Sequence, residues 1–184
     1  MVSSFTRAIP VRRPKGAAAA GFTLIELMVA VAVIGILVGV GLPEFRQGLQ
    51  NSRVKGAGTD MFLSLLLARS EGIKRSANID LVRGGGAWTD GWSVQVASDS
   101  TVLRSNDALK GDLTLDCNTD TDTGTETCPA SVTFNRSGKA TSIIEYRFYI
   151  SGNDAVRMRC VVMSLSGRPS LLVDNDVDPT NGCM

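Results

Sequence analysis

The longest run of apolar residues in the chain lies near its start, at residues 22–42. Glu26 is the one charged residue among these 21 positions. As an α-helix with a rise of ~1.5 Å per residue, the run would extend about 31 Å. This length matches the ~30 Å hydrocarbon core of a bilayer. The pattern therefore predicts a helix that crosses a membrane once.

From Pro43 onward the apolar residues recur at steps of mostly three and four, which is the period of one helical face. We therefore expect an amphipathic helix over residues 43–75 that ends between Gly72 and Arg75. The positions on its apolar face are Phe45, Leu49, Val54, Ala57, Met61, Leu65 and Ala68.

Beyond residue 76 the pattern changes to short strand-like runs separated by glycine and by Asp/Asn turns. The candidate strands are Ile79–Arg83, Gly91–Ala97, Thr101–Arg104, Leu113–Leu115, Ser131–Asn135, Ile143–Ile150, Val156–Leu165 and Ser170–Val173. The sequence thus predicts an α+β fold, in which a long N-terminal helix packs on an antiparallel sheet or a small β-sandwich. The expected parts are a leader (1–21), a transmembrane half-helix (22–42), an amphipathic half-helix (43–75) and a globular β domain (76–184).

Composition narrows the function classes. The 184 residues carry a net charge of +1, which excludes a highly basic, histone-like nucleic-acid binder. The chain contains no histidine, so Ser-His-Asp and Cys-His catalysis and imidazole metal sites are excluded. Ser70 consequently has no histidine base to activate it. These observations favour a protein that is not an enzyme.

Charge is distributed unevenly around the apolar run. The first 21 residues contain four basic residues and no acid, namely Arg7, Arg12, Arg13 and Lys15. Basic residues before a membrane helix favour the cytoplasmic side, so the body should face outward. A conventional signal peptide is the alternative, with Gly39 and Gly41 near its cleavage site. The length of the run and its internal acid argue against that alternative.

Glu26 needs an explanation, because a carboxylate within a membrane helix costs up to about 2.5–3.5 kcal/mol. If the chain were cut between Gly21 and Phe22, the new amine of one subunit could pair with Glu26 of its neighbour. Cleavage at this position therefore accounts for the acid.

The segment Gly21-Phe22-Thr23-Leu24-Ile25-Glu26-Leu27 resembles the prepilin cleavage motif of type IV pilins and type II secretion pseudopilins. The resemblance implies that a prepilin peptidase cuts after Gly21 and N-methylates Phe22, and that Glu26 guides assembly into a filament. Pro43 falls where many of these proteins kink or loosen the helix.

The body is similar to the FimT/GspH group of minor pilins and pseudopilins. The segments that carry this likeness are Ala68–Ile73, Trp88–Val94, Val132–Gly138 and Arg159–Arg168. The likeness implies a subunit held in the bacterial inner membrane by its helix, with its C-terminal domain in the periplasm, and later part of a pilus or pseudopilus. The implied partners are other minor and major pilins or pseudopilins, the prepilin peptidase, the inner-membrane assembly platform and membrane lipid. For Arg69 and Glu71, at the helix end, local capping or pairing is the structural interpretation.

The four cysteines suggest two disulfides in an outward-facing body, although three connectivities are open. Pairing of neighbours is the simplest: Cys117 with Cys128, and Cys160 with Cys183. A C-terminal disulfide loop is common among pilins, so the resemblance supports the second pair. Zinc bound by four thiolates is the rival, and the absence of Cys-x-x-Cys spacing disfavours it.

Two weaker hypotheses concern ligands. Alternating acids at Asp120 and Asp122, and at Asp174, Asp176 and Asp178, have the oxygen ligands that calcium requires, yet neither segment matches an EF-hand loop. Solvated turn acids are the simpler interpretation, and no cofactor is expected. The alternative function is a DNA-binding minor pilin for DNA uptake. The Gly-Arg-x-Arg element of DNA-binding relatives is reduced here to Gly167-Arg168, and the net negative body disfavours nucleic acid.

Overall fold

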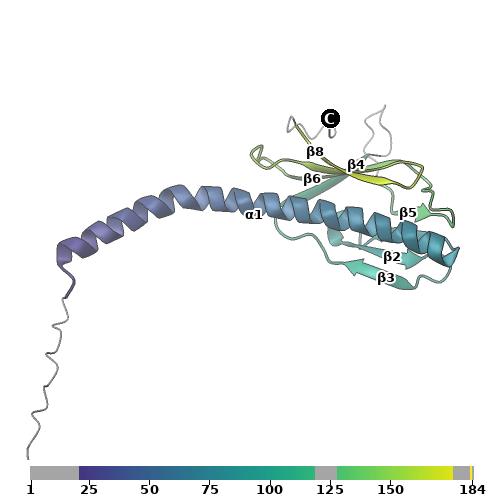
Figure 1. The fold of residues 1–184 in the computed structure, drawn as a ribbon, viewed down its shortest axis with the longest axis horizontal. Helices are drawn as coiled ribbons and strands as arrows, with labels where there is room; N and C mark the ends of the chain where they lie inside the picture. The colour runs from purple at the N-terminus through teal and green to yellow at the C-terminus, as the bar shows by residue number, and fades with distance from the viewer. Residues whose placement is uncertain (1–20, 119–127, 176–182, 184) are drawn as a thin grey trace, which may run out of the picture. The chain divides into compact units, whose positions relative to one another are not determined.

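The computed structural model describes residues 21–118, 128–175 and 183, without the side chains of Val40 and Pro43. It confirms the α+β class: one long helix, α1 (Leu24–Arg75), is followed by antiparallel strands (Figure 1). The chain divides into two compact units, residues 1–41 and residues 42–184. The backbone stays helical across Pro43, and α1 contributes to both units.

In the described part of the first unit, residues 24–41 are helical. The described side chains of this segment are exposed. The first unit therefore presents apolar surface without a protein core of its own.

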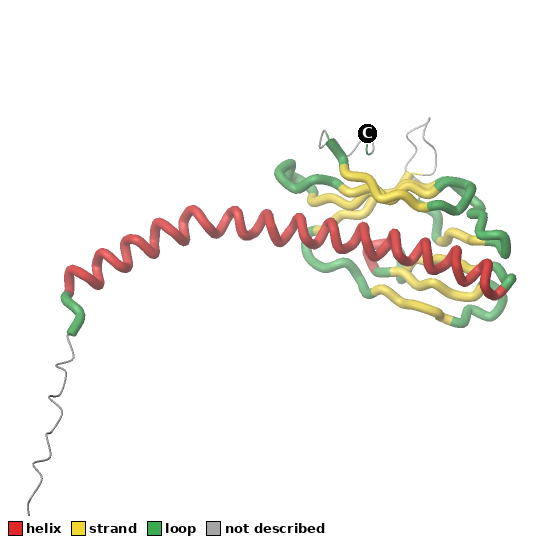
Figure 2. The backbone as a smooth tube through the Cα atoms, viewed as in Figure 1, coloured by secondary structure: helices red, strands yellow, loops and turns green. Residues whose placement is uncertain are grey.

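The second unit combines the C-terminal half of α1 with eight strands and a short 3₁₀ turn, η1 (Trp88–Asp90). The strands are β1 (Ile79–Arg83), β2 (Trp92–Val96), β3 (Val102–Asn106), β4 (Leu113–Asn118), β5 (Ser131–Phe134), β6 (Ile144–Ile150), β7 (Arg159–Met163) and β8 (Pro169–Val173). They form two antiparallel four-stranded sheets, ordered β3-β2-β1-β5 and β4-β6-β7-β8. Figure 2 shows the C-terminal half of the helix lying along both groups of strands.

The core lies between the two sheets and one face of α1. Buried helix positions follow the helical period: Val54, Ala57, Met61, Leu65 and Ala68. Strand residues alternate between buried and less buried positions with a period of two, so that β1 buries Ile79 and Leu81. The apolar side chains on this face of α1 and on the inner faces of the sheets therefore share one core.

The buried face of α1 begins later than its apolar pattern suggests. Phe45 is 72% exposed and Leu49 is 45% exposed. The body first bonds to the helix at Gln50, whose Nε2 donates to Asp112 Oδ2 at 2.7 Å. Asn153 Nδ2 donates to Gln50 Oε1, also at 2.7 Å. Phe45 and Leu49 precede this junction, so the strands leave both uncovered.

One buried polar side chain connects the helix to the first sheet. Ser64 is fully buried on α1, and its Oγ accepts a 2.9 Å hydrogen bond from Trp92 Nε1 on β2. The same hydroxyl lies 2.7 Å from the Asp60 carbonyl and 3.3 Å from Asn106 Oδ1 on β3. Because an unpaired polar group in a core is costly, this contact fixes where β2 and β3 meet the helix.

Candidate functional site

Thr23 caps the start of α1. Its Oγ1 accepts a hydrogen bond from the Glu26 N–H at 3.3 Å, and its carbonyl accepts one from the Leu27 N–H at 3.2 Å. Thr23 and Glu26 have the spacing of a capping box. Glu26 also lies in the first turn, where the helix dipole stabilises a negative charge. Sequence reasoning on Glu26 alone missed this local role, which the Thr-x-x-Glu spacing encodes.

Gly21 and Phe22 precede the helix and have few neighbours in the described chain. A Cβ built on Gly21 would meet no described atom within 4 Å, and Phe22 is 82% exposed. The described chain therefore has no packing reason to require glycine at position 21. A role for Gly21 in cleavage stays a prediction.

The apolar helix that follows is long enough to cross a membrane. Its most apolar 18-residue window has a mean hydropathy of 2.6, and no part of that window is buried within the described structure. Covering such a surface with lipid or with other apolar helices lowers the free energy, because apolar side chains leave water. The first unit therefore places a capped helix start, with an exposed carboxylate, at one end of an apolar anchor.

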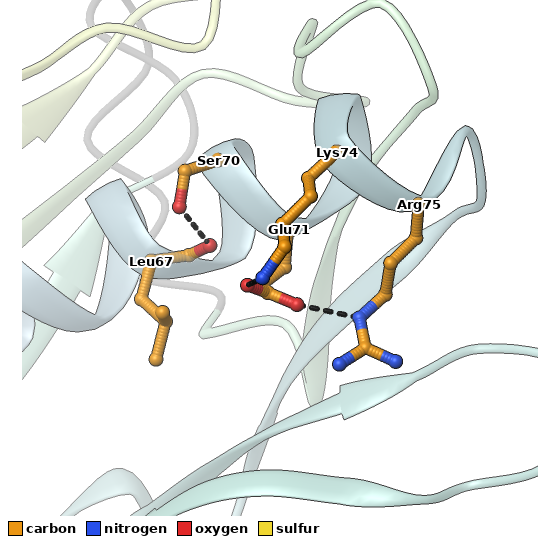
Figure 3. A network of polar contacts seen from close by, with 5 residues as sticks. All are labelled: Leu67, Ser70, Glu71, Lys74 and Arg75. Carbon is orange, nitrogen blue, oxygen red and sulfur yellow. Dashed lines mark hydrogen bonds and ion pairs between the residues drawn. The ribbon is translucent and has the colours of Figure 1, made fainter.

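The opposite end of α1 carries an ion-pair network (Figure 3). Glu71 bonds to Arg75 Nε at 2.5 Å and to Lys74 Nζ at 3.3 Å. The Arg75 guanidinium, and then the Lys74 ammonium, lower the pKa of the Glu71 carboxyl. Ser70 Oγ donates to the Leu67 carbonyl at 2.9 Å, which occupies its proton within the helix. Glu71 and Ser70 therefore make bonds within the last turns of α1, which is a structural role.

Two disulfides join the cysteines as neighbours in the sequence: Cys117 with Cys128, and Cys160 with Cys183. No free cysteine remains, so this pairing favours the disulfides over the tetrathiolate zinc alternative. The second bond attaches residue 183 to β7. The Cys183 N–H also donates to Glu145 Oε1 on β6 at 3.2 Å, and Glu145 Oε2 pairs with Arg147 at 3.3 Å. Residue 183 is thus fixed to the second sheet by a covalent bond and a hydrogen bond.

The calcium candidates lie mostly outside the described residues, namely Asp120, Asp122, Asp176 and Asp178. Asp174 is described: it is buried at the end of β8, and its N–H donates to the Met158 carbonyl at 3.1 Å. Calcium binding stays a prediction.

Arg168, the DNA candidate, is exposed on the turn between β7 and β8. The turn between β5 and β6 lies against it, because the Ala140 N–H donates to the Leu165 carbonyl at 3.2 Å. That second turn carries exposed Arg136 and Lys139. Three cations therefore occupy two contacting turns at this end of the body.

Two known protein families match the sequence. The prokaryotic N-terminal methylation motif matches residues 17–42, which include Gly21, Phe22 and Glu26. The family of the type II transport protein GspH matches residues 57–167, more than half of the chain.

Curated relatives match part of the chain. The type IV major pilin protein PilE of Neisseria gonorrhoeae is 36% identical over 83 residues, which are 45% of this chain and 44% of PilE. The type IV major fimbrial protein FimA of Dichelobacter nodosus is 50% identical over 34 residues, 18% of this chain and 22% of FimA. The chain thus matches less than half the length of these relatives.

Solved structures share the fold. The type IV minor pilin FimU of Pseudomonas aeruginosa superposes with a TM-score of 0.53 at 18% identity, over 72% of this chain and 96% of FimU. The minor pseudopilin EpsH of Vibrio cholerae gives 0.50 at 19% identity, over 66% and 97%. The relatives are structural pilins and pseudopilins, which are not enzymes. With a methylation motif that spans the start of the apolar helix and the GspH match across the body, the chain belongs to the GspH family of type IV pilin-like proteins.

Proposed function

We propose that this protein is a minor pilin or pseudopilin, a structural subunit in the initiation or tip complex of a type II secretion pseudopilus or a type IV pilus. A prepilin peptidase would remove residues 1–21 and methylate the amine of Phe22. The observation that carries the proposal is the first unit: an exposed Gly21-Phe22 junction, a capped helix start at Glu26, and an uncovered apolar helix.

Before assembly, the apolar helix would anchor the protein in the inner membrane. The four basic residues of the leader favour the cytoplasmic side. The body would then lie in the periplasm, where its two disulfides are stable. The assembly platform would extract the subunit and stack its helix against those of other pilins or pseudopilins.

Glu26 substitutions test whether assembly needs its charge or its capping geometry. Glu26→Val removes both, whereas Glu26→Gln keeps a polar side chain that fits the capping box but carries no charge. If Glu26 pairs with the Phe22 amine of a neighbour, both variants should insert and be cleaved, and both should be lost from purified filaments. Thr23→Ala is the matched control, because it removes only the cap. Recovery of Glu26→Val in filaments at the wild-type level would contradict the proposed function.

A second candidate function, DNA binding, rests on the three exposed cations of the contacting turns. Duplex DNA titrated against the wild type and the triple variant Arg136→Ala/Lys139→Ala/Arg168→Ala tests it. A DNA-binding subunit should lose salt-sensitive affinity in the triple variant. Equal binding by the two proteins would remove this candidate.

A further inference from the structure

The strand β8 forms an edge of the second sheet, and its unpaired side has a defined hydrogen-bonding pattern. The Asp174 N–H donates to the Met158 carbonyl, and the Ser164 N–H donates to the Arg168 carbonyl. These two bonds set the phase of the β7–β8 ladder. The backbone N–H and carbonyl groups of Ser170 and Leu172 therefore point toward β7. The backbone groups of the alternate residues point away from the sheet.

The outward-pointing groups belong to Pro169, Leu171 and Val173. Leu171 and Val173 each present an N–H and a carbonyl, and Pro169 presents a carbonyl only. No other described segment pairs with β8 on this side. Cys183 bonds to Cys160 on β7 and to Glu145 on β6 rather than to β8. The free edge therefore offers donors and acceptors at the two-residue spacing of an extended chain.

The side chains of β8 make this edge unusual among the four sheet edges. Leu171, Leu172 and Val173 are 36%, 40% and 38% exposed, and β8 contains no charged residue. By contrast, β3 carries Arg104 and has a register shift against β2. Exposed edges are normally protected by charges, proline or bulges, because an unprotected edge pairs with another chain. On β8 only Pro169, at the first position, has this protective effect.

The other two edges are less open than β8. The outer side of β5 is partly occupied, because the Thr141 N–H donates to the Thr133 carbonyl and Phe134 forms a bridge with Ala140. The strand β4 carries Asp116, whose carboxylate accepts a hydrogen bond from the Tyr149 hydroxyl. Among the described edges, the exposed apolar and uncharged one is therefore β8.

We infer that the free edge of β8 is a docking edge that takes an extended, uncharged, apolar segment of a neighbouring pilin subunit by strand addition. This inference rests on the proposed function. Main-chain hydrogen bonds at Leu171 and Val173 would supply affinity, and the exposed apolar side chains would supply the packing. The edge runs beside the chain's own α1, where the Leu171 Cδ1 lies 3.4 Å from a Cβ built on Gly58. Under the proposed function, α1 is the helix against which neighbouring subunits stack.

The geometry also argues against a symmetric pair of β8 strands as the occupant. An antiparallel β8–β8 pair has its twofold axis perpendicular to the sheet, so the two copies of α1 beside the sheets would point in opposite directions. Subunits anchored in one membrane, or stacked in one filament, have their helices pointing the same way. The occupant is therefore an extended segment of the neighbour that lies beside β8.

The test uses the full-length protein in its host, with incorporation into purified filaments measured by quantitative mass spectrometry against the major pilin. Leu171→Pro removes an outward N–H without removing a bond to β7, and Leu171→Ala is the matched control that keeps this N–H. We expect Leu171→Pro to reduce incorporation at least fivefold and Leu171→Ala to stay within twofold of the wild type. Equal incorporation of the two variants would overturn the inference.

Two further measurements keep the test decisive. If Leu171→Pro fails to fold, hydrogen exchange of the wild type decides: the Leu171 and Val173 amides should be protected in filaments and not in detergent-solubilised monomers. Unchanged exchange at both amides overturns the inference. Glu26→Val separates the two proposals, because its normal incorporation contradicts the proposed function. Loss of Glu26→Val together with normal incorporation of Leu171→Pro refutes the docking edge alone.

Discussion

Removing the C-terminal disulfide should destabilise the body by an amount that the chain length it closes determines. Cys160 and Cys183 are 23 residues apart, and Cys117 and Cys128 are 11 apart. Loop-closure entropy gives about 3.4 kcal/mol for the first bond and about 2.8 kcal/mol for the second. Each bond has one cysteine that is at most 1% exposed, Cys160 or Cys117. The costs of truncating these sulfurs therefore largely cancel when the two pairs are compared.

The assay compares Cys160→Ala/Cys183→Ala with Cys117→Ala/Cys128→Ala in the full chain, solubilised in detergent. The chain has two tryptophans, Trp88 and Trp92, and both are buried in the body, so their fluorescence reports the body alone. Losing about 3 kcal/mol should lower Tm by roughly 10–15 °C in either double variant. The first variant should also expose its tail to protease. A loss below about 1 kcal/mol in the first variant, beside the expected loss in the second, would refute the restraint of the tail by its disulfide.

Three other variants test single contacts. Gly21→Val should keep its leader, and intact mass after expression with a prepilin peptidase checks this; normal processing would contradict a cut after Gly21. Ser64→Ala should lower the free energy of unfolding by about 1–3 kcal/mol in urea, because Trp92 loses its acceptor, whereas exposed Ser52→Ala should change it little. Burial raises the pKa of Tyr146 well above its ordinary value, so its contribution to stability is intact below about pH 10 and falls as pH rises toward the folded pKa. Tyr146→Phe should therefore lose less stability at alkaline pH than the wild type, as urea unfolding at neutral and alkaline pH measures.

Local pattern was enough to predict most elements of the body. The period of two predicted β1 with the bounds that the structure has, and the helix ends at Arg75 as expected. The run from Val156 to Leu165 was too long as a strand, because β7 covers only Arg159–Met163. Val156 lies in a turn, where its N–H bonds to the Asn153 carbonyl. Periodicity reports burial, and buried turn residues continue an apolar run beyond the strand.

Strand order and the contacts that join distant segments were beyond the reach of local pattern. Nothing in the sequence near β5 shows that it pairs with β1, which lies about 50 residues earlier. The Ser64 hydroxyl looks like an ordinary helix residue until β2 brings Trp92 against it. At the N-terminal site the situation is reversed. Its motif is contiguous in sequence, so the amino-acid pattern alone identifies the residues from Gly21 to Glu26.

Gln50, where the body first bonds to α1, has a consequence for how such subunits diversify. Between Leu42 and Leu49 the described side chains of the helix are largely exposed, and at ~1.5 Å per residue this neck is about 12 Å long. Under the proposed function, the helix surface that has to match other subunits is thereby separated from most of the body. Mutations in the sheets outside β8 could then accumulate without altering the shape of the anchor. One common anchor can then carry bodies of very different sequence within the same filament.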